Sequence, residues 1–153
     1  NTNGISDIVV GAKLQLFKKD NINTEIALLS NLVLPSGPKG LSNGKVGSIN
    51  KICLSHSLTE IINMGYNVGY NYFGSDNEML TYSLAFGIRI NENTGFFIET
   101  YGDYLDFEIL EANFDAGITY LVKDNFQLDF SFGHGINYKM NYISTGVSWN
   151  ISK

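Results

Sequence analysis

The stretch IINMGYNVGYNYF, from Ile61 to Phe73, alternates between two kinds of side chain. From Ile62 onward one face carries only apolar and aromatic residues, and the other carries only Asn and Gly. A period of two residues indicates a β-strand, because successive side chains along a strand point to opposite faces. We therefore predict a long strand here, with one apolar face and one face that hydrates well.

The same alternation recurs along the whole chain, and no segment shows a convincing period of 3.6 residues. One long loop interrupts it at Pro35–Gly47, which holds both prolines and reads as an exposed connector. The alternation predicts nine strands: Asp7–Phe17, Ile22–Leu34, Ser48–Leu58, Ile61–Phe73, Met79–Ile90, Gly95–Leu105, Ala112–Val122, Phe126–Asn137 and Ile143–Ile151.

The apolar faces are too large for the inside of a small soluble barrel. Nearly every strand offers several large apolar side chains on one face, against Gly, Ser, Asn, Asp and Thr on the other. Because the interior of a small barrel is limited, we expect the apolar faces to point outward into lipid. The prediction is an all-β, antiparallel transmembrane β-barrel, with a soluble β-protein as the alternative. Amphipathic rings near strand ends are expected at the lipid–water interface: Tyr70, Tyr72, Tyr120, Tyr142 and Trp149.

Composition narrows the function classes. The chain of 153 residues suits a single domain, 1–153, and its 16% of charged residues is low for a soluble protein. The net charge of −5 argues against a nucleic-acid partner. A single cysteine rules out an internal disulfide, and with no His/Cys cluster we expect neither a metal nor another cofactor. No apolar run is long enough for a transmembrane helix.

The spacing of the turns predicts an orientation. Four tight turns lie between alternate strand pairs, and the long loop falls at the opposite end. Bacterial barrels have short periplasmic turns, longer outer loops and an even number of strands. Nine strands are odd, so we expect further strands upstream of Asn1, making this the C-terminal part of a barrel of 10–12 strands. A miscounted strand is the alternative.

Several stretches resemble a known family of outer-membrane proteins, the MetA-pathway-of-phenol-degradation type, often labelled transporters. The resemblance rests on GISDIVVGAKLQLF at Gly4–Phe17, LVLPSG at Leu32–Gly37, NMGYNVGYNYFG at Asn63–Gly74, FFIETYGDY at Phe96–Tyr104 and FDAGITYLVKDNFQLDFSFGHGIN at Phe114–Asn137. It implies an outer-membrane barrel of Gram-negative bacteria and the uptake of small hydrophobic molecules. The chain departs from the usual barrel pattern by ending on Ile151-Ser152-Lys153 rather than on an aromatic residue.

The polar faces supply the candidate lumen-lining residues, which are Lys13, Glu25, Lys51, Asn63, Asn67, Asn71, Arg89, Phe97, Glu99, Tyr101, Asp103, Asp115 and Asp129. We expect Arg89 and Glu99 to meet diagonally across a tight turn. The acidic excess predicts a weak cation preference if water passes. These charges are explained equally well by a network of salt bridges that fills and closes the lumen.

Three functions remain open from the sequence. The first is a non-enzymatic channel for small solutes, hydrophobic ones among them, in contact with outer-membrane lipid. The second is a non-transporting accessory or anchoring barrel among other envelope proteins, as in the type IX secretion and gliding machinery of Bacteroidetes. The third is a lipid enzyme with a serine nucleophile and a histidine base. Ser55 and Ser57 flank His56 on one strand and therefore point to the opposite face, so the nucleophile–base pair is not formed. We predict no catalytic residues.

Overall fold

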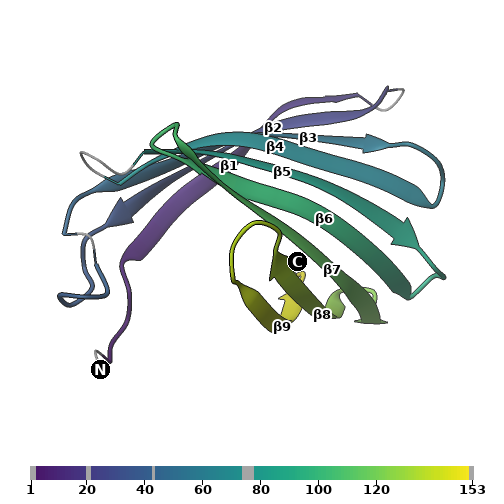
Figure 1. Ribbon diagram of the computed structural model, residues 1–153. Coiled ribbons are helices and arrows are strands. Elements are labelled where there is room, and N and C mark those ends of the chain that lie inside the picture. Colours follow the sequence, from purple (N-terminus) through teal and green to yellow (C-terminus); the bar gives the residue numbers. More distant parts are fainter. Residues whose placement is uncertain (1–2, 20–21, 43, 74–77, 152–153) are drawn as a thin grey trace.

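One antiparallel sheet of nine strands makes up the computed structural model, which describes residues 3–19, 22–42, 44–73 and 78–151. Each strand pairs with its neighbours in sequence, and the sheet curves into an open trough with β1 and β9 at its two edges (Figure 1). The strands are β1 Ile8–Lys19, β2 Ile22–Leu34, β3 Gly47–Ser57, β4 Ile62–Tyr72, β5 Glu78–Arg89, β6 Thr94–Leu105, β7 Ile109–Lys123, β8 Phe126–Gly135 and β9 Asn141–Trp149. The predicted all-β, antiparallel architecture is confirmed. The described part of the chain has no helix of the length and hydropathy needed to cross a membrane.

The turn between β6 and β7 is shorter than the sequence suggested. We expected a connection through Glu111, but β7 already begins at Ile109. Asp106 and Phe107 both adopt positive φ angles, 48° and 58°, and the Glu108 amide donates to the Leu105 carbonyl at 2.9 Å. A non-glycine residue rarely takes such a conformation, so the sequence carried no turn signal here.

A bulge in β1 changes which face its last residues occupy. The pairing with β2 shifts between Gln15 and Phe17, so Lys18 lies opposite Glu25 instead of in the predicted turn. The extra residue sends Lys18 to the polar face, where its Nζ lies 2.7 Å from a Glu25 carboxylate oxygen. Alternation alone could not reveal this ion pair, because a bulge resets the period of two.

The long loop between β2 and β3 is hydrogen-bonded to the first residue of β1 and to the residues just before it. The Gly37 amide donates to Asp7 Oδ1 at 3.0 Å, and the Ile8 amide donates to Ser36 Oγ at 2.9 Å. The Ser6 hydroxyl also donates to the Leu41 carbonyl, at 3.1 Å. The predicted loop is therefore present and folds back against the chain. Most of the predicted connection at 75–78 lies outside the described residues.

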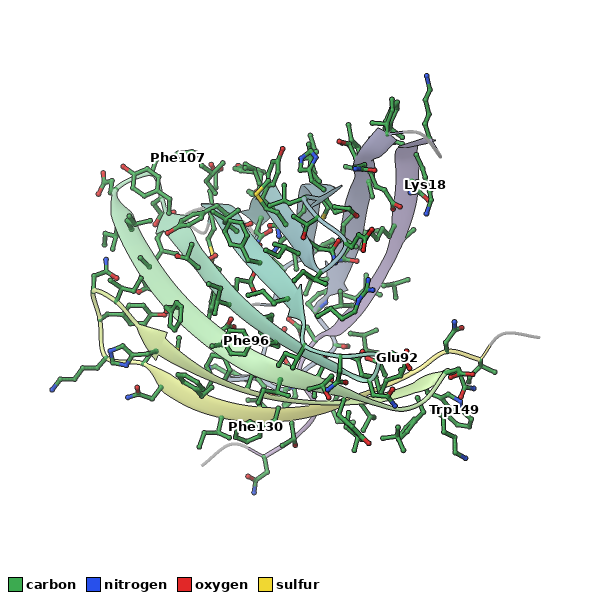
Figure 2. All side chains as sticks on the ribbon, turned by 90° about the vertical axis from the view of Figure 1, so that its right-hand side faces the viewer. Lys18, Glu92, Phe96, Phe107, Phe130 and Trp149 are labelled. Atoms are coloured by element: carbon green, nitrogen blue, oxygen red, sulfur yellow. The ribbon has the colours of Figure 1, made fainter. Side chains whose placement is uncertain are left out.

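The two faces of the sheet differ as an inside-out barrel requires. Large apolar side chains stand exposed on the convex face, among them Val68 at 54%, Phe130 at 49% and Ile143 at 75%. Figure 2 shows Phe130 and Trp149 on the outside of the curve. Among the described residues, the buried hydrophobic side chains are only Ala27, Val33 and Ala116. A sheet with so small an apolar core and so large an apolar exterior is stable against lipid rather than water.

A charge on the convex face should therefore hurt assembly, and the same charge on the concave face should not. Val68→Arg is expected to destabilise the membrane-inserted protein by about 2–4 kcal/mol if Val68 lies near the bilayer midplane. Gln15→Arg is the matched control, since Gln15 lies on the concave side and its side-chain amide already donates to Glu25 at 3.1 Å. Unfolding by denaturant in lipid vesicles measures both. Equal effects of the two substitutions would contradict the assignment of the faces.

Candidate functional site

The registers place all the candidate lumen residues on one face of the sheet. Residues directly opposite each other on neighbouring strands share a face. One row runs from Lys13 through Lys51 to Asp103, and another from Glu25 through Glu99 to Asp115. This is the concave face of the trough, and the role of these residues in a lumen stays a prediction.

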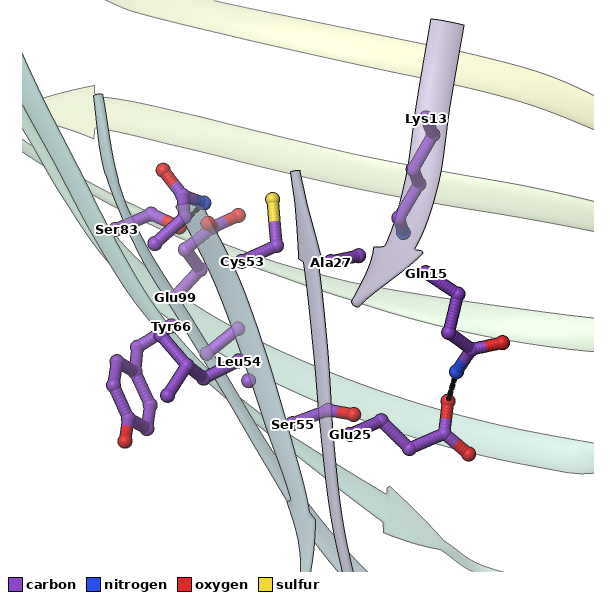
Figure 3. A pocket seen from close by; sticks show the side chains of 13 residues that line it. Lys13, Gln15, Glu25, Ala27, Cys53, Leu54, Ser55, Tyr66, Ser83 and Glu99 are labelled. Atoms are coloured by element: carbon purple, nitrogen blue, oxygen red, sulfur yellow. Dashed lines mark hydrogen bonds between the residues drawn. The ribbon is translucent and has the colours of Figure 1, made fainter. Parts of the chain in front are cut away.

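A hollow of about 510 Å³ lies in the concave face and extends from β1 to β6. Figure 3 shows Lys13 and Gln15 from β1 on one side of it and Ser83 and Glu99 from β5 and β6 on the other. Cys53, the free cysteine, lies between them. Most of its lining residues are small or polar, with Leu54 and Tyr66 as the large exceptions, so water and polar solutes can reach it.

Two glycines of the concave face accommodate aromatic rings. Gly117 and Gly133 lie directly opposite Phe97 and Tyr142, and a Cβ at either glycine would clash with the opposing ring. The rings therefore lie flat against the wall instead of projecting from it. Such glycine–aromatic pairing across strands stabilises a curved sheet while leaving space above it.

A second hollow of about 370 Å³, here called the acidic recess, lies over the middle of the sheet. It receives three carboxylates, from Glu99, Asp103 and Asp115, and one ammonium group, from Lys51. The recess is lined by Lys51, Asn67, Thr81, Tyr82, Ser83, Glu99, Tyr101, Gly102, Asp103, Asp115 and Tyr142.

The carboxylate of Asp115 is buried in the wall of the acidic recess. Its residue is 7% exposed, and Oδ2 accepts a hydrogen bond from the Tyr142 hydroxyl at 2.5 Å. Tyr142 reaches this position by crossing over Gly133. The prediction that Tyr142 lies at the lipid interface is therefore wrong. The other predicted interfacial rings, Tyr70, Tyr72, Tyr120 and Trp149, are exposed on the convex face.

Charge is distributed unevenly around the trough. On the side of β1 to β3, the concave face bears Lys13, Lys51 and the ion pair between Lys18 and Glu25, whereas β6, β7 and β8 contribute the acids Glu99, Asp103, Asp115 and Asp129. Glu99 and Asp115 are directly opposite each other on neighbouring strands. Like charges in that arrangement repel each other, and a cation placed between them would lower that repulsion.

The expected contact between Arg89 and Glu99 does not form. Arg89 pairs with Gly95, while Glu99 pairs with Ala85. The two side chains are therefore four residues apart along the strands, or about 13 Å. The prediction was wrong because a diagonal contact reaches only two residues beyond the opposite position.

Both histidines lie on the convex face and contact residues other than serine. Nδ1 of His56 lies 2.8 Å from Thr24 Oγ1, and Nε2 lies 3.1 Å from the Tyr66 hydroxyl. Nδ1 of His134 lies 2.7 Å from Asn141 Oδ1. Ser55 and Ser57 occupy the opposite face, so neither faces His56 as a nucleophile would. Across the described ranges, no group of His, Cys, Asp and Glu is arranged to hold a metal ion.

The bond between Tyr142 and Asp115 should contribute measurably to stability. Tyr142→Phe leaves a buried carboxylate without its donor, at an expected cost of about 1–3 kcal/mol in the free energy of unfolding. Tyr120→Phe is the control, because Tyr120 is 50% exposed on the convex face. Equilibrium unfolding in vesicles gives both values, and a Tyr142→Phe protein as stable as the control would show that the bond contributes nothing.

Comparison with known proteins identifies a family. No curated protein sequence matches the chain. A solved structure described as "De novo design of transmembrane beta-barrels" aligns over 86% of this chain and 97% of its own, with 10% identity and a TM-score of 0.42. The family described as "Putative MetA-pathway of phenol degradation" matches residues 1–150. That match covers nearly the whole chain and agrees with the strand and turn signatures, so the chain belongs to this family.

Proposed function

We propose that this protein forms the wall of an outer-membrane channel that passes small solutes without catalysing a reaction. The observation that carries the proposal is the division between the two faces of one sheet. The convex face exposes residues such as Val68 and Phe130, whereas the concave face bears the polar hollows. A sheet with this division separates lipid from a hydrated path.

The concave wall favours polar solutes over purely hydrophobic ones. Small polar residues such as Asn67 and Ser83 line both hollows, and apolar side chains are few there. The rings of Phe97 and Tyr101 add aromatic surface on the same face. The family name refers to phenol, a small aromatic molecule with one hydroxyl group, which a wall of this mixed character could accommodate.

Conductance in planar lipid bilayers tests the channel. Purified folded protein is expected to give discrete current steps, and Ser83→Trp should reduce each step by about half or more, because a bulky ring narrows the hydrated path. Leu84→Trp is the matched control, since Leu84 is the next residue in β5 and points to the opposite face.

Folding must be shown independently in this experiment. Heat-modifiable migration on a denaturing gel reports whether each protein has formed a barrel. Folded protein that inserts into the bilayer and carries no current would contradict the channel. Equal effects of Ser83→Trp and Leu84→Trp would contradict the assignment of the path to the concave face.

An accessory role in an envelope complex is the second candidate. It is favoured by the open edges of the sheet, where β1 and β9 do not pair with each other and further strands, from this protein or from a partner, can join. In that case the folded protein is electrically silent and purifies in fixed ratio with a larger assembly. Channel steps from the isolated protein would argue for the first candidate.

A further inference from the structure

We propose that the acidic recess binds the primary ammonium group of a small organic cation. This inference deepens the proposed function, because a site on the concave wall acts on solutes that enter the channel. The proposed binding site for the ammonium group, here called the seat, consists of four residues that line the recess: Glu99, Asp115, Tyr101 and Tyr142.

The first argument is a buried oxygen without a partner. Asp115 is 7% exposed, and while Oδ2 accepts from Tyr142, Oδ1 has no hydrogen-bond partner. Thr81, at 4% exposure, leaves its Oγ1 without a partner in the same recess, as Asn67 does with Oδ1. Buried polar atoms are normally satisfied, so unpartnered oxygens on three side chains that line one recess indicate a ligand that brings donors.

The second argument is the opposition of two carboxylates. Glu99 and Asp115 face each other directly across β6 and β7, where the Cβ atoms of such pairs lie about 5 Å apart. Two carboxylates at that spacing repel each other when no cation is present, and a cation bound between them is attracted by both. Among the described residues that line the recess, Lys51 is the only cationic one, and it lies on β3, three strands away from β6. With three carboxylates against one ammonium group, the lining keeps a net negative charge.

The third argument concerns the kind of cation. Tyr101 and Tyr142 bring aromatic rings to the seat, and ring faces attract organic ammonium groups. A hard metal ion prefers six or more oxygen ligands, and the described residues hold no cluster of metal ligands. The length of the recess, from Glu99 to Asp103 along β6, gives room for a carbon chain beyond the ammonium group.

Calorimetric titration of the full chain, folded in detergent at low salt, tests the site with 1,4-diaminobutane as probe. Butane-1,4-diol is the uncharged counterpart and is expected not to bind. Asp115→Asn and Glu99→Gln should each weaken diamine binding by about tenfold, because each removes a charged acceptor. Asp124→Asn, in the turn between β7 and β8, makes the same change of charge away from the recess and should leave binding unchanged.

The outcomes separate this inference from the channel. Diamine binding without conductance supports the site and contradicts the channel; conductance without diamine binding overturns the site and leaves the channel standing. Equal loss in Asp124→Asn and Asp115→Asn would overturn the site, since it would reflect net charge alone. Glu99→Gln serves as the second variant if Asp115→Asn fails to fold, because the Glu99 side chain makes no hydrogen bond in the structure.

Discussion

Backbone hydrogen bonding between neighbouring strands is the constraint on which the rest of the structure depends. In an apolar environment every amide and carbonyl needs a partner within the protein, and a ladder of antiparallel strands supplies it. The order from β1 to β9 follows the sequence, so each ladder forms between adjacent segments. Once the register is set, alternation decides the face of every side chain, and a slip by one residue would exchange the lipid side with the water side.

The same constraint shapes the concave face and its chemistry. Because the backbone is already satisfied, the side chains on this face need not form a dry core, and small residues can leave open hollows. Because Gly133 has no side chain, the Tyr142 ring lies over it and its hydroxyl reaches Asp115. This hydrogen bond holds the buried Asp115 carboxylate beside Glu99. The cost of bringing two acids together is offset when a cation or water occupies the space between them. Polar side chains are thus concentrated on the concave face.

Alternation was sufficient to predict the strands and most of their bounds, as for β4, where Ile61–Phe73 was expected and Ile62–Tyr72 is found. It failed where the backbone departs from regular pleating: at the bulge that turns Lys18 inward, and at the positive φ angles of Asp106 and Phe107. The acidic recess could not be predicted, because it depends on registers that bring residues of β3 to β9 together. Tyr142 shows this most clearly, since only the pairing of β9 with β8 places it over a glycine.

The native cysteine allows the most direct test of the inside-out assignment. Cys53 lines the concave hollow, whereas Val68 is 54% exposed on the convex face. A charged, membrane-impermeant thiol reagent is applied to protein in lipid vesicles, with Cys53 intact in one sample and with Cys53→Ser combined with Val68→Cys in the other. Rapid modification of Cys53 and protection of the cysteine at position 68 is the expected result. Modification at position 68 with protection of Cys53 would contradict the account.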